Sequence, residues 1–323
     1  MPLLTVGARR RVLKCPAMNA TTPVRQTAPP RRVSLVLHPR RDVGVAIGQV
    51  TAWAQRTGVE LAAVEDGRLP DGVRRCAIDE LADGCDIVLA LGGDGTMLGG
   101  LRLAAPLGVP VLGANLGRLG YLTEVDGEHL VEGLEALGAG HYAVEERFML
   151  RAQWGPDGAQ TEHVAFNDVV LSRVPGRGQA LLALHVDGQL LVRYASDGVI
   201  AATPAGSTVY SYAAGGPIVS PQTRAMIVTP DAPHGLFNRA VVLGAEESLG
   251  VEVLPRSAPV AVEVDGQLLV QADPGWTVEI TPNPWPALVV RLGSAGFAER
   301  ARRKLGITDP AALANYDFAG HQR

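Results

Sequence analysis

The stretch Asp86–Thr96, which reads DIVLALGGDGT, decides the fold of this chain of 323 residues. Its first part, Asp86–Leu91, is a short apolar run that predicts a buried strand. A glycine-rich turn follows, and the pattern after it predicts a helix over Thr96–Ala105. A strand that ends in a glycine turn and continues into a helix is typical of a βαβ unit in a parallel sheet.

The segments around this unit repeat the alternation of strand and helix. Short apolar runs predict further strands at Val33–Leu37, Leu61–Val64 and Val109–Ala114. A helix is predicted between the first two, at about Val43–Arg56. Because strands that alternate with helices form parallel sheets, we expect an α/β domain in the N-terminal part of the chain.

From about Val144 the pattern changes to short strands separated by Gly, Pro and Asp, which predicts an antiparallel, sandwich-like second domain. The sequence VDGQLLV occurs twice, at Val186–Val192 and Val264–Val270, and Asp-Gly between apolar residues predicts a hairpin in each copy. A last helix is predicted at Phe297–Leu305. The expected strands are Leu150–Trp154, Val169–Ser172, Leu181–Val186, Leu190–Tyr194, Val251–Leu254, Val260–Val264, Leu268–Ala272 and Leu288–Leu292.

These patterns divide the chain into segments. We expect a disordered basic tail over 1–32, an α/β nucleotide-binding domain over 33–143 and a β-rich domain over 144–295. Residues 296–311 are expected to return to the α/β domain. Two other interpretations of the tail stay open: an Arg-rich targeting peptide, or a translation start at Met18.

Composition argues against several classes of function. Nine basic residues precede the first acidic residue, Asp42, yet the formal net charge is −4, so the body of the chain is acidic. An acidic body argues against a nucleic-acid surface, and no apolar run approaches the about 20 residues of a membrane span. The three scattered cysteines indicate reduced thiols. We therefore expect a cytoplasmic protein that binds neither nucleic acid nor a membrane.

The glycine turn predicts a phosphate cradle made by Gly92, Gly93 and Thr96. The start of a helix offers free N–H groups, and glycines let a ligand approach the backbone closely. Asp94 would repel a phosphate unless it holds Mg²⁺ or accepts a proton from an attacking hydroxyl. The alternative is a tight turn in which Asp94 caps the helix.

A second turn of small residues, Thr203–Tyr210, follows another predicted strand. Ser207 or Thr208 could cap the short helix after it and donate to a ligand oxygen, or the segment could be an ordinary loop. Asn167 and Asp168 could grip a ribose diol, because an amide donates and a carboxylate accepts. The alternative for this pair is an Asx turn.

Taken together, the segments from Asp86 to about Leu305 resemble the NAD kinase family. The most specific are Asn115–Glu124 and Thr203–Tyr210, since lipid kinases and phosphofructokinases share turns like Gly92–Thr96. The resemblance implies a phosphofructokinase-like N-terminal domain and phosphorylation of NAD to NADP by ATP or polyphosphate. The other matching segments are Arg147–Leu150, Asn167-Asp168, Asp197-Gly198, Gly215–Pro217, Thr229-Pro230, Pro233-His234 and Asp265–Gln267.

The resemblance also implies roles for single residues. Asp94 would take the proton from the 2′-hydroxyl of the adenosine ribose, and Gly95 would lie against the NAD. Asp197 would reach the NAD of a neighbouring subunit, since such kinases form homodimers or homotetramers. Mg²⁺ is expected to arrive with ATP, because no set of protein ligands for a metal stands out. The remaining expected NAD-binding residues are Asn167, Asp168, Ala195, Thr208, Val209, Tyr210, Ser211, Tyr212, Ala213 and Gln267.

A few positions depart from the family's usual residues. Met97 and Tyr121 stand where Phe is usual, and Val209 replaces a common Ala and adds bulk beside Tyr210. Asp168 replaces the usual Glu, which keeps the charge but shortens the reach. Two other functions stay open at this point: a lipid kinase of the diacylglycerol or sphingosine kinase type, and a non-catalytic NAD(P)(H) sensor.

Overall fold

The computed structural model describes residues 28–117, 120, 122–155, 161–293 and 297–308. Most of the expected basic tail and residues 309–311 therefore lie outside the described residues. The chain up to Leu292 forms one compact unit, and the residues from Gly293 form a second. The helix of the second unit, α5, spans Phe297–Leu305 as predicted.

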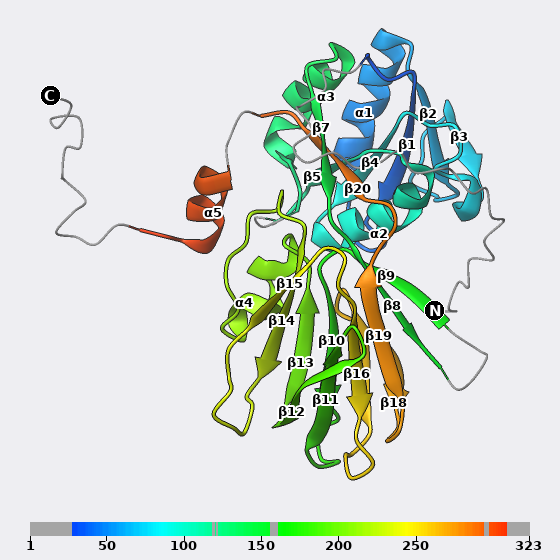
Figure 1. Cartoon of the computed structure of the whole chain (residues 1–323). Helices are drawn as coiled ribbons and strands as arrows, with labels where there is room; N and C mark the ends of the chain where they lie inside the picture. Colours follow the sequence, from blue (N-terminus) through cyan, green and yellow to red (C-terminus); the bar gives the residue numbers. More distant parts are fainter. Residues whose placement is uncertain (1–27, 118–119, 121, 156–160, 294–296, 309–323) are drawn as a thin grey trace, which may run out of the picture. The chain divides into compact units, whose positions relative to one another are not determined.

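The first unit begins with an eight-stranded sheet in the order β3-β2-β1-β4-β5-β20-β7, with β6 paired to β5 (Figure 1). All its pairs are parallel except the pair of β20 with β7. The parallel α/β arrangement expected from the sequence is confirmed. The strands are β1 (Arg32–Leu37), β2 (Glu60–Val64), β3 (Val73–Cys76), β4 (Ile87–Gly92), β5 (Val111–Asn115), β6 (Val125–Asp126), β7 (Ala143–Arg147) and β20 (Ala287–Arg291).

Helices cover both faces of this sheet. Helices α1 (Gly44–Thr57) and α3 (Leu130–Gly138) share a buried cluster with one set of strand side chains. Helix α2 (Asp94–Ala104) shares another cluster with the alternate set. Every residue of β4 is consequently buried, which explains why its sequence is an unbroken apolar run. Short 3-10 turns cover Ile78–Glu80, Ala105–Leu107, Gly127–His129 and Gly206–Thr208.

One strand does not lie where the sequence placed it. The stretch Leu288–Leu292 was expected in the β-rich domain, but strand β20 lies between β5 and β7 of the first sheet. Its short apolar run fits a buried strand of either sheet, so the local sequence could not identify its partners. Strand β7, which the sequence left in the β-rich part, also joins the first sheet.

The β-rich part consists of two antiparallel sheets of six strands each. The second sheet has the order β15-β14-β13-β10-β17-β18, and the third sheet has the order β12-β11-β16-β19-β8-β9. One apolar cluster joins their facing sides, which confirms the expected sandwich. The strands are β8 (Leu150–Trp154), β9 (Thr161–Ala165), β10 (Asp168–Arg173), β11 (Ala180–Val186), β12 (Gln189–Ser196), β13 (Gly198–Ala202), β14 (Ala225–Asp231), β15 (Val241–Gly244), β16 (Leu249–Val253), β17 (Val260–Val264), β18 (Gln267–Ala272) and β19 (Thr277–Pro282).

The outer face of the second sheet carries a short helix, α4 (Tyr210–Ala213). A small apolar cluster that includes Val170, Ile200 and Ile227 lies on this face, with Ala214 packed against it. The segment that contains α4 therefore follows the sheet surface from the end of β13 to the start of β14.

Helix α2 packs on the first sheet and on the β-rich part at the same time. Its residues Met97, Leu98 and Leu101 are buried in a cluster that also contains strand residues of the first sheet. Phe166, just before β10, belongs to the same cluster, and Ala205 packs against it. The helix that starts at the glycine turn thus fixes that turn relative to the Asn167 region.

We expect Gly99→Ala to stabilise the protein. Gly99 lies inside α2, and a Cβ atom placed on it would meet no atom within 4 Å. Alanine favours a helix interior over glycine by about 0.5–1 kcal/mol. The Tm measured by circular dichroism should rise by about 1–3 °C.

The contrasting variant is Gly198→Ala in β13. A Cβ atom there would lie 2.6 Å from the carbonyl oxygen of Leu171 and 3.2 Å from Cα of Ser172. Because both neighbours are backbone atoms of the paired strand, they cannot rotate away, and the Tm should fall. An unchanged Tm would contradict the close approach of β10 and β13.

Candidate functional site

Asp94 begins helix α2 at the carboxyl edge of the first sheet. The helix is capped by Gly93 without any side-chain hydrogen bond, so Asp94 does not cap it. Its Oδ1 instead accepts the backbone N–H of Leu122 at 2.9 Å. A Cβ atom on Gly120 would come within 2.7 Å of the same oxygen. The carboxylate therefore faces the segment after β5. This segment is part of Asn115–Glu124, one of the two stretches that most specifically resemble the family named above.

The glycine turn is packed too tightly for side chains at its first position. A Cβ atom on Gly92 would lie 2.1 Å from Oγ1 of Thr96 and 3.0 Å from Cβ of His38. The amides of Thr96 and Met97 both donate to the Gly93 carbonyl, so these two are used inside the turn. Among the described residues, no acceptor is found for the Gly95 N–H, which leaves that amide for a ligand.

Thr96 is more than nine-tenths buried, and its hydroxyl lies over Gly92. Within the described part of the chain this hydroxyl has no hydrogen-bond partner. A buried hydroxyl without a partner is costly, so a ligand oxygen at the turn would remove that cost.

Asn167 and Asp168 lie just before and at the start of β10, and both are buried. Their backbone amides donate to one carboxylate oxygen of Asp265, at 2.7 Å and 3.3 Å. The side-chain atoms Asn167 Oδ1 and Asp168 Oδ2 have no partner among the described residues. Their backbones are therefore held in place, while two buried side-chain oxygens lack the hydrogen-bond partners that a ligand could supply.

Asp265 anchors this pair to helix α2. Its side chain has no exposed surface, and its Oδ2 lies 3.2 Å from NH2 of Arg102 and 3.2 Å from the N–H of Phe166. Arg102 also donates to Oε1 of Gln267 at 3.0 Å. One carboxylate thus joins α2, the loop before β10 and the hairpin that carries Gln267.

The first copy of VDGQLLV shows that this anchor is not a property of the hairpin itself. In both copies the Asp and Gly have positive φ, as expected for the turn: 49° and 75° at Asp187 and Gly188, 47° and 72° at Asp265 and Gly266. Asp187 accepts hydrogen bonds only from Ser248 among the described residues, in an exposed setting. Sequence reasoning selected Gln267 but missed Asp265 and Arg102, because nothing local distinguishes the two copies.

The second glycine turn packs directly on Asn167. A Cβ atom on Gly206 would lie 2.0 Å from the carbonyl oxygen of Asn167, so only glycine fits. Thr203 donates its hydroxyl to the Phe166 carbonyl and accepts the Gly206 N–H. Ser207 is buried, donates to the Pro204 carbonyl and accepts the Val219 N–H.

The expectation that Ser207 or Thr208 caps the following helix is wrong. Helix α4 is preceded by Val209 at its N-cap position, with no side-chain hydrogen bond. Ser207 is used inside the turn because the buried Pro204 carbonyl and Val219 amide need partners.

The residues of Thr208–Ala213 differ in how exposed they are to solvent. Val209, Tyr210, Tyr212 and Ala213 are exposed, and Thr208 is half-buried. Ser211 is fully buried, with its hydroxyl 2.9 Å from that of Thr229. A ligand on this surface would meet the first group, whereas the Ser211 side chain faces the protein interior.

Asp197 and Tyr210 meet in a cavity of about 420 Å³ on the second sheet. The Asp197 carboxylate lies 2.5 Å from Nε of Arg173, and the Tyr210 hydroxyl donates to Asp231 at 2.9 Å. Burial and the Asp231 carboxylate raise the pKa of Tyr210 to about 12, so the phenol remains a hydrogen-bond donor. The other lining residues are Ser172, Val174, Pro175, Ala261, Glu263, Leu268 and Gln271.

This cavity is separate from the Asn167 region. In the pairing of β10 with β13, Asp168 is opposite Ala202, whereas Ser172 is opposite Gly198, which follows Asp197. Four residues of strand correspond to roughly 14 Å. Ala195 lies in β12 of the third sheet, where its carbonyl accepts the His234 N–H, and among the described residues it is not one of those that line the cavity.

Comparison with known proteins identifies the family. Residues 45–142 match the ATP-NAD kinase N-terminal domain, and residues 166–292 match the ATP-NAD kinase C-terminal domain. NAD kinase 1 of Streptomyces avermitilis is 38% identical over 322 residues, which cover 88% of this chain and 90% of that protein. The chain belongs to the ATP-NAD kinase family.

Other members and solved structures agree. The NAD kinase of Desulforamulus reducens is 38% identical over 267 residues, covering 82% of this chain and 93% of the relative. Yeast NADH kinase, complexed with NADH, has a TM-score of 0.78 at 22% identity, covering 90% of this chain and 94% of its own, and shares the fold. An NAD kinase from Archaeoglobus fulgidus, in complex with ATP, has a TM-score of 0.64 at 29% identity, covering 85% and 97%.

We expect Asp265→Asn to lower stability and weaken NAD binding, because an amide has no charge for Arg102 and only one acceptor atom. The loss should be about 2 kcal/mol or more of unfolding free energy, with a raised KM for NAD. Urea denaturation and steady-state kinetics measure the two effects.

The matched control is Asp187→Asn at the same position of the first hairpin. Asparagine can accept the same Ser248 hydrogen bonds and tolerates positive φ, so stability and KM should stay close to those of the unchanged protein. Equal losses in the two variants would show that only the turn matters.

A pH-dependent prediction concerns Asp168. Its burial, and then the Asp265 and Glu263 carboxylates, raise its pKa from 3.8 to about 7. Between these values the folded state binds more protons than the unfolded state, so stability falls as pH rises toward 7. Asp168→Asn removes this loss, and its Tm should exceed that of the unchanged protein at about pH 8, with the gap closing toward about pH 5. A gap independent of pH would contradict the raised pKa.

Proposed function

We propose that this protein transfers the γ-phosphate of ATP to the 2′-hydroxyl of the adenosine ribose of NAD, giving NADP and ADP. Membership of the ATP-NAD kinase family supports the reaction. The observation that carries it is the placement of Asp94 at the start of α2, beside the glycine turn and held by the Leu122 amide. A lipid kinase is not favoured, because both family domains and the relatives are those of NAD kinases.

Asp94 would act as the general base. The carboxylate accepts the 2′-hydroxyl proton as the oxygen attacks the γ-phosphorus, and the bond between the γ-phosphorus and its bridging oxygen breaks to release ADP. One of its oxygens accepts the Leu122 N–H, which holds the carboxylate between the glycine turn and the segment after β5. The Gly95 amide and the Thr96 hydroxyl would contact phosphate oxygens at the turn, and Gly92 and Gly93 give them access.

The side chains of Asn167 and Asp168 would bind the NAD through hydrogen bonds. Two side-chain oxygens without partners, on a backbone held by Asp265, could accept from hydroxyl groups of a ribose or from the amide of the nicotinamide end. Gln267 would stand beside them through its bond to Arg102. The exposed residues of Thr208–Ala213 would line the adenosine, with the Tyr210 ring as the apolar surface.

A divalent cation, expected to be Mg²⁺, would neutralise phosphate charge. The described residues contain no group of three or more His, Cys, Asp or Glu side chains placed to hold a metal ion. Asp94 is one carboxylate at the turn, and Mg²⁺ commonly binds one or two carboxylates together with substrate phosphates. We expect the cation to be held mostly by the phosphates of ATP.

A second copy of the chain would complete the site. Asp197 lies five strand residues, or roughly 17 Å, along the sheet from Asp168, too far to share one ribose with it. Its cavity opens on the outer face of the second sheet and is lined by Tyr210. We expect a homodimer or homotetramer in which Asp197 of one subunit reaches the NAD of another.

No helix among the described residues is long and apolar enough to cross a membrane.

The test is Asp94→Asn. Asparagine keeps the size and one acceptor but cannot take a proton, so kcat should fall by about 10²–10⁴-fold while the Kd for NAD changes little. An enzyme-coupled NADP assay and isothermal titration with NAD measure these quantities. Asp71→Asn, at an exposed position, is the control and should leave both unchanged.

Turnover near the normal rate in Asp94→Asn would overturn the role of Asp94. An absence of NADP formation by the unchanged protein, despite NAD binding, would instead favour the sensor alternative. Offering NAD and NADH with ATP or polyphosphate in the same assay identifies the preferred acceptor and donor.

A further inference from the structure

The loop after β1, residues 38–41, runs beside the glycine turn. Strands β1 and β4 pair in parallel up to Leu37 and Leu91, so both chains leave the sheet at the same edge. The His38 N–H donates to the Leu91 carbonyl at 2.9 Å. Cβ of His38 lies 3.0 Å from the place where a Gly92 side chain would start.

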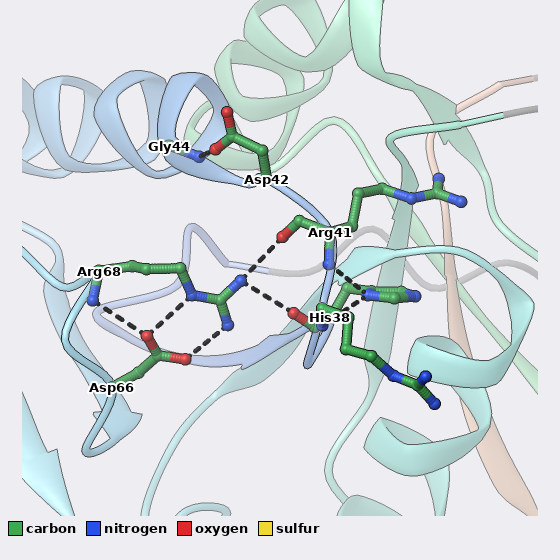
Figure 2. A network of polar contacts seen from close by, with 7 residues as sticks. His38, Arg41, Asp42, Gly44, Asp66 and Arg68 are labelled. Carbon is green, nitrogen blue, oxygen red and sulfur yellow. Dashed lines mark hydrogen bonds and ion pairs between the residues drawn. The ribbon is translucent and has the colours of Figure 1, made fainter.

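Figure 2 shows how this loop is held. Nδ1 of His38 accepts the N–H groups of Arg40 and Arg41, at 3.1 Å and 2.9 Å. NH1 of Arg68 donates to the carbonyls of His38 and Arg41, at 3.0 Å and 2.8 Å. The charge of Arg68 is matched by the Asp66 carboxylate, which accepts from both its Nε and NH2. Arg68 is therefore fully used in shaping the loop.

The His38 ring must be neutral for this arrangement, because a protonated Nδ1 cannot accept. Burial lowers the pKa of His38, and the charges of Arg41, Arg40 and Arg68 lower it further. The loop backbone thus keeps its shape at neutral pH without any help from the Arg41 side chain.

The Arg41 side chain reaches from the loop after β1 to the segment after β5. Its NH1 lies 1.8 Å from the place that a Cβ atom of Gly117 would occupy, so the guanidinium rests against the segment after β5. Since the strand order is β1-β4-β5, the loop that carries Arg41 and the segment that its guanidinium contacts lie on either side of the end of β4, where the glycine turn begins.

The guanidinium is not neutralised within the described part of the chain. None of the ion pairs there involves Arg41. The neighbouring carboxylate of Asp42 instead accepts the Gly44 N–H at the start of α1. A cation of this kind beside a turn with an open amide and a buried, unpartnered hydroxyl at Thr96 has the composition of an anion site.

We propose that Arg41 binds the terminal phosphates of the phosphoryl donor, a nucleoside triphosphate or an inorganic polyphosphate, over the glycine turn. The proposal rests on the function proposed above. A planar guanidinium binds two phosphate oxygens at once and keeps its charge at any working pH. Because the body of the protein is acidic, a local cation is needed to hold a polyanion.

The alternative is that Arg41 only supports the segment at Gly117. A structural role would lower stability and raise the KM values of both substrates together. A donor ligand would raise the KM for the donor alone, since charge-assisted hydrogen bonds to that substrate are lost.

The experiment compares Arg41→Met and Arg41→Lys with the unchanged protein. Methionine keeps much of the side-chain length without the charge, so the KM for ATP should rise about 10- to 100-fold at saturating NAD, with the KM for NAD within about twofold. Lysine keeps the charge but not the two-pronged geometry, and should give an intermediate value. Arg74→Met, at an exposed position of β3, is the matched control and should change neither KM.

Titration calorimetry with Mg²⁺-ATP in the absence of NAD gives an independent measurement of donor binding. An unchanged ATP affinity in a folded Arg41→Met would overturn the proposal, as would equal rises in both KM values with a lower Tm. If Arg41→Met does not fold, an Arg41→Lys with unchanged kinetics for ATP overturns it instead.

A second arm replaces ATP by inorganic polyphosphate, and whichever donor the unchanged protein uses should be the one that Arg41→Met binds worse. Failure of the proposed function is distinguishable from failure of this inference. In the first case the unchanged protein forms no NADP, whereas the calorimetric comparison of ATP binding still tests Arg41.

Discussion

The carboxylate of Asp265 is the interaction on which the candidate site depends. It accepts three consecutive backbone N–H groups, from Phe166 to Asp168, and faces the guanidinium of Arg102. A buried charge is tolerated only when donors surround it, and each of these donors belongs to an element that the site needs. The loop that presents Asn167 and Asp168 and the helix that begins at Asp94 are thereby held in one framework.

In that framework the backbone groups have hydrogen-bond partners, whereas several side chains of the candidate site have none within the described part of the chain. The Asn167 and Asp168 side chains and the Thr96 hydroxyl have no partners among the described residues, although the amides around them are bonded. Such groups cost stability, and the raised pKa of Asp168 has the same main cause, the burial of a polar group. A bound dinucleotide and its phosphate donor would supply the missing partners. The same few atoms would therefore determine both the affinity for these ligands and the selectivity between them and other ligands.

The sequence predicted the fold where a pattern is local. The apolar runs of the parallel strands, the helix after the glycine turn and both VDGQLLV hairpins were found within a few residues of their bounds. Strand β20 was assigned to the wrong sheet, because a short apolar run shows that a strand is buried but not beside which strand it lies. In the candidate site, the glycine turns and Asp94 could be predicted, because a local sequence pattern marks each of them. Contacts with residues distant in sequence determine the roles of Asp265, Arg102 and Arg41. The spacing of residues along the chain does not predict such contacts.

The late position of β20 in the chain has a consequence for how the protein assembles. This strand lies in the interior of the first sheet, between β5 and β7, although about half of the chain separates it from them. On the side away from β4, strand β5 pairs with β6 only at Ala114 and Asn115, so the rest of that edge has no partner until residues 287–291 have left the ribosome. An open edge on a buried strand invites pairing with other chains. The N-terminal half is thus exposed to aggregation for most of its synthesis, and a fragment that stops before β20 would keep that hazard permanently.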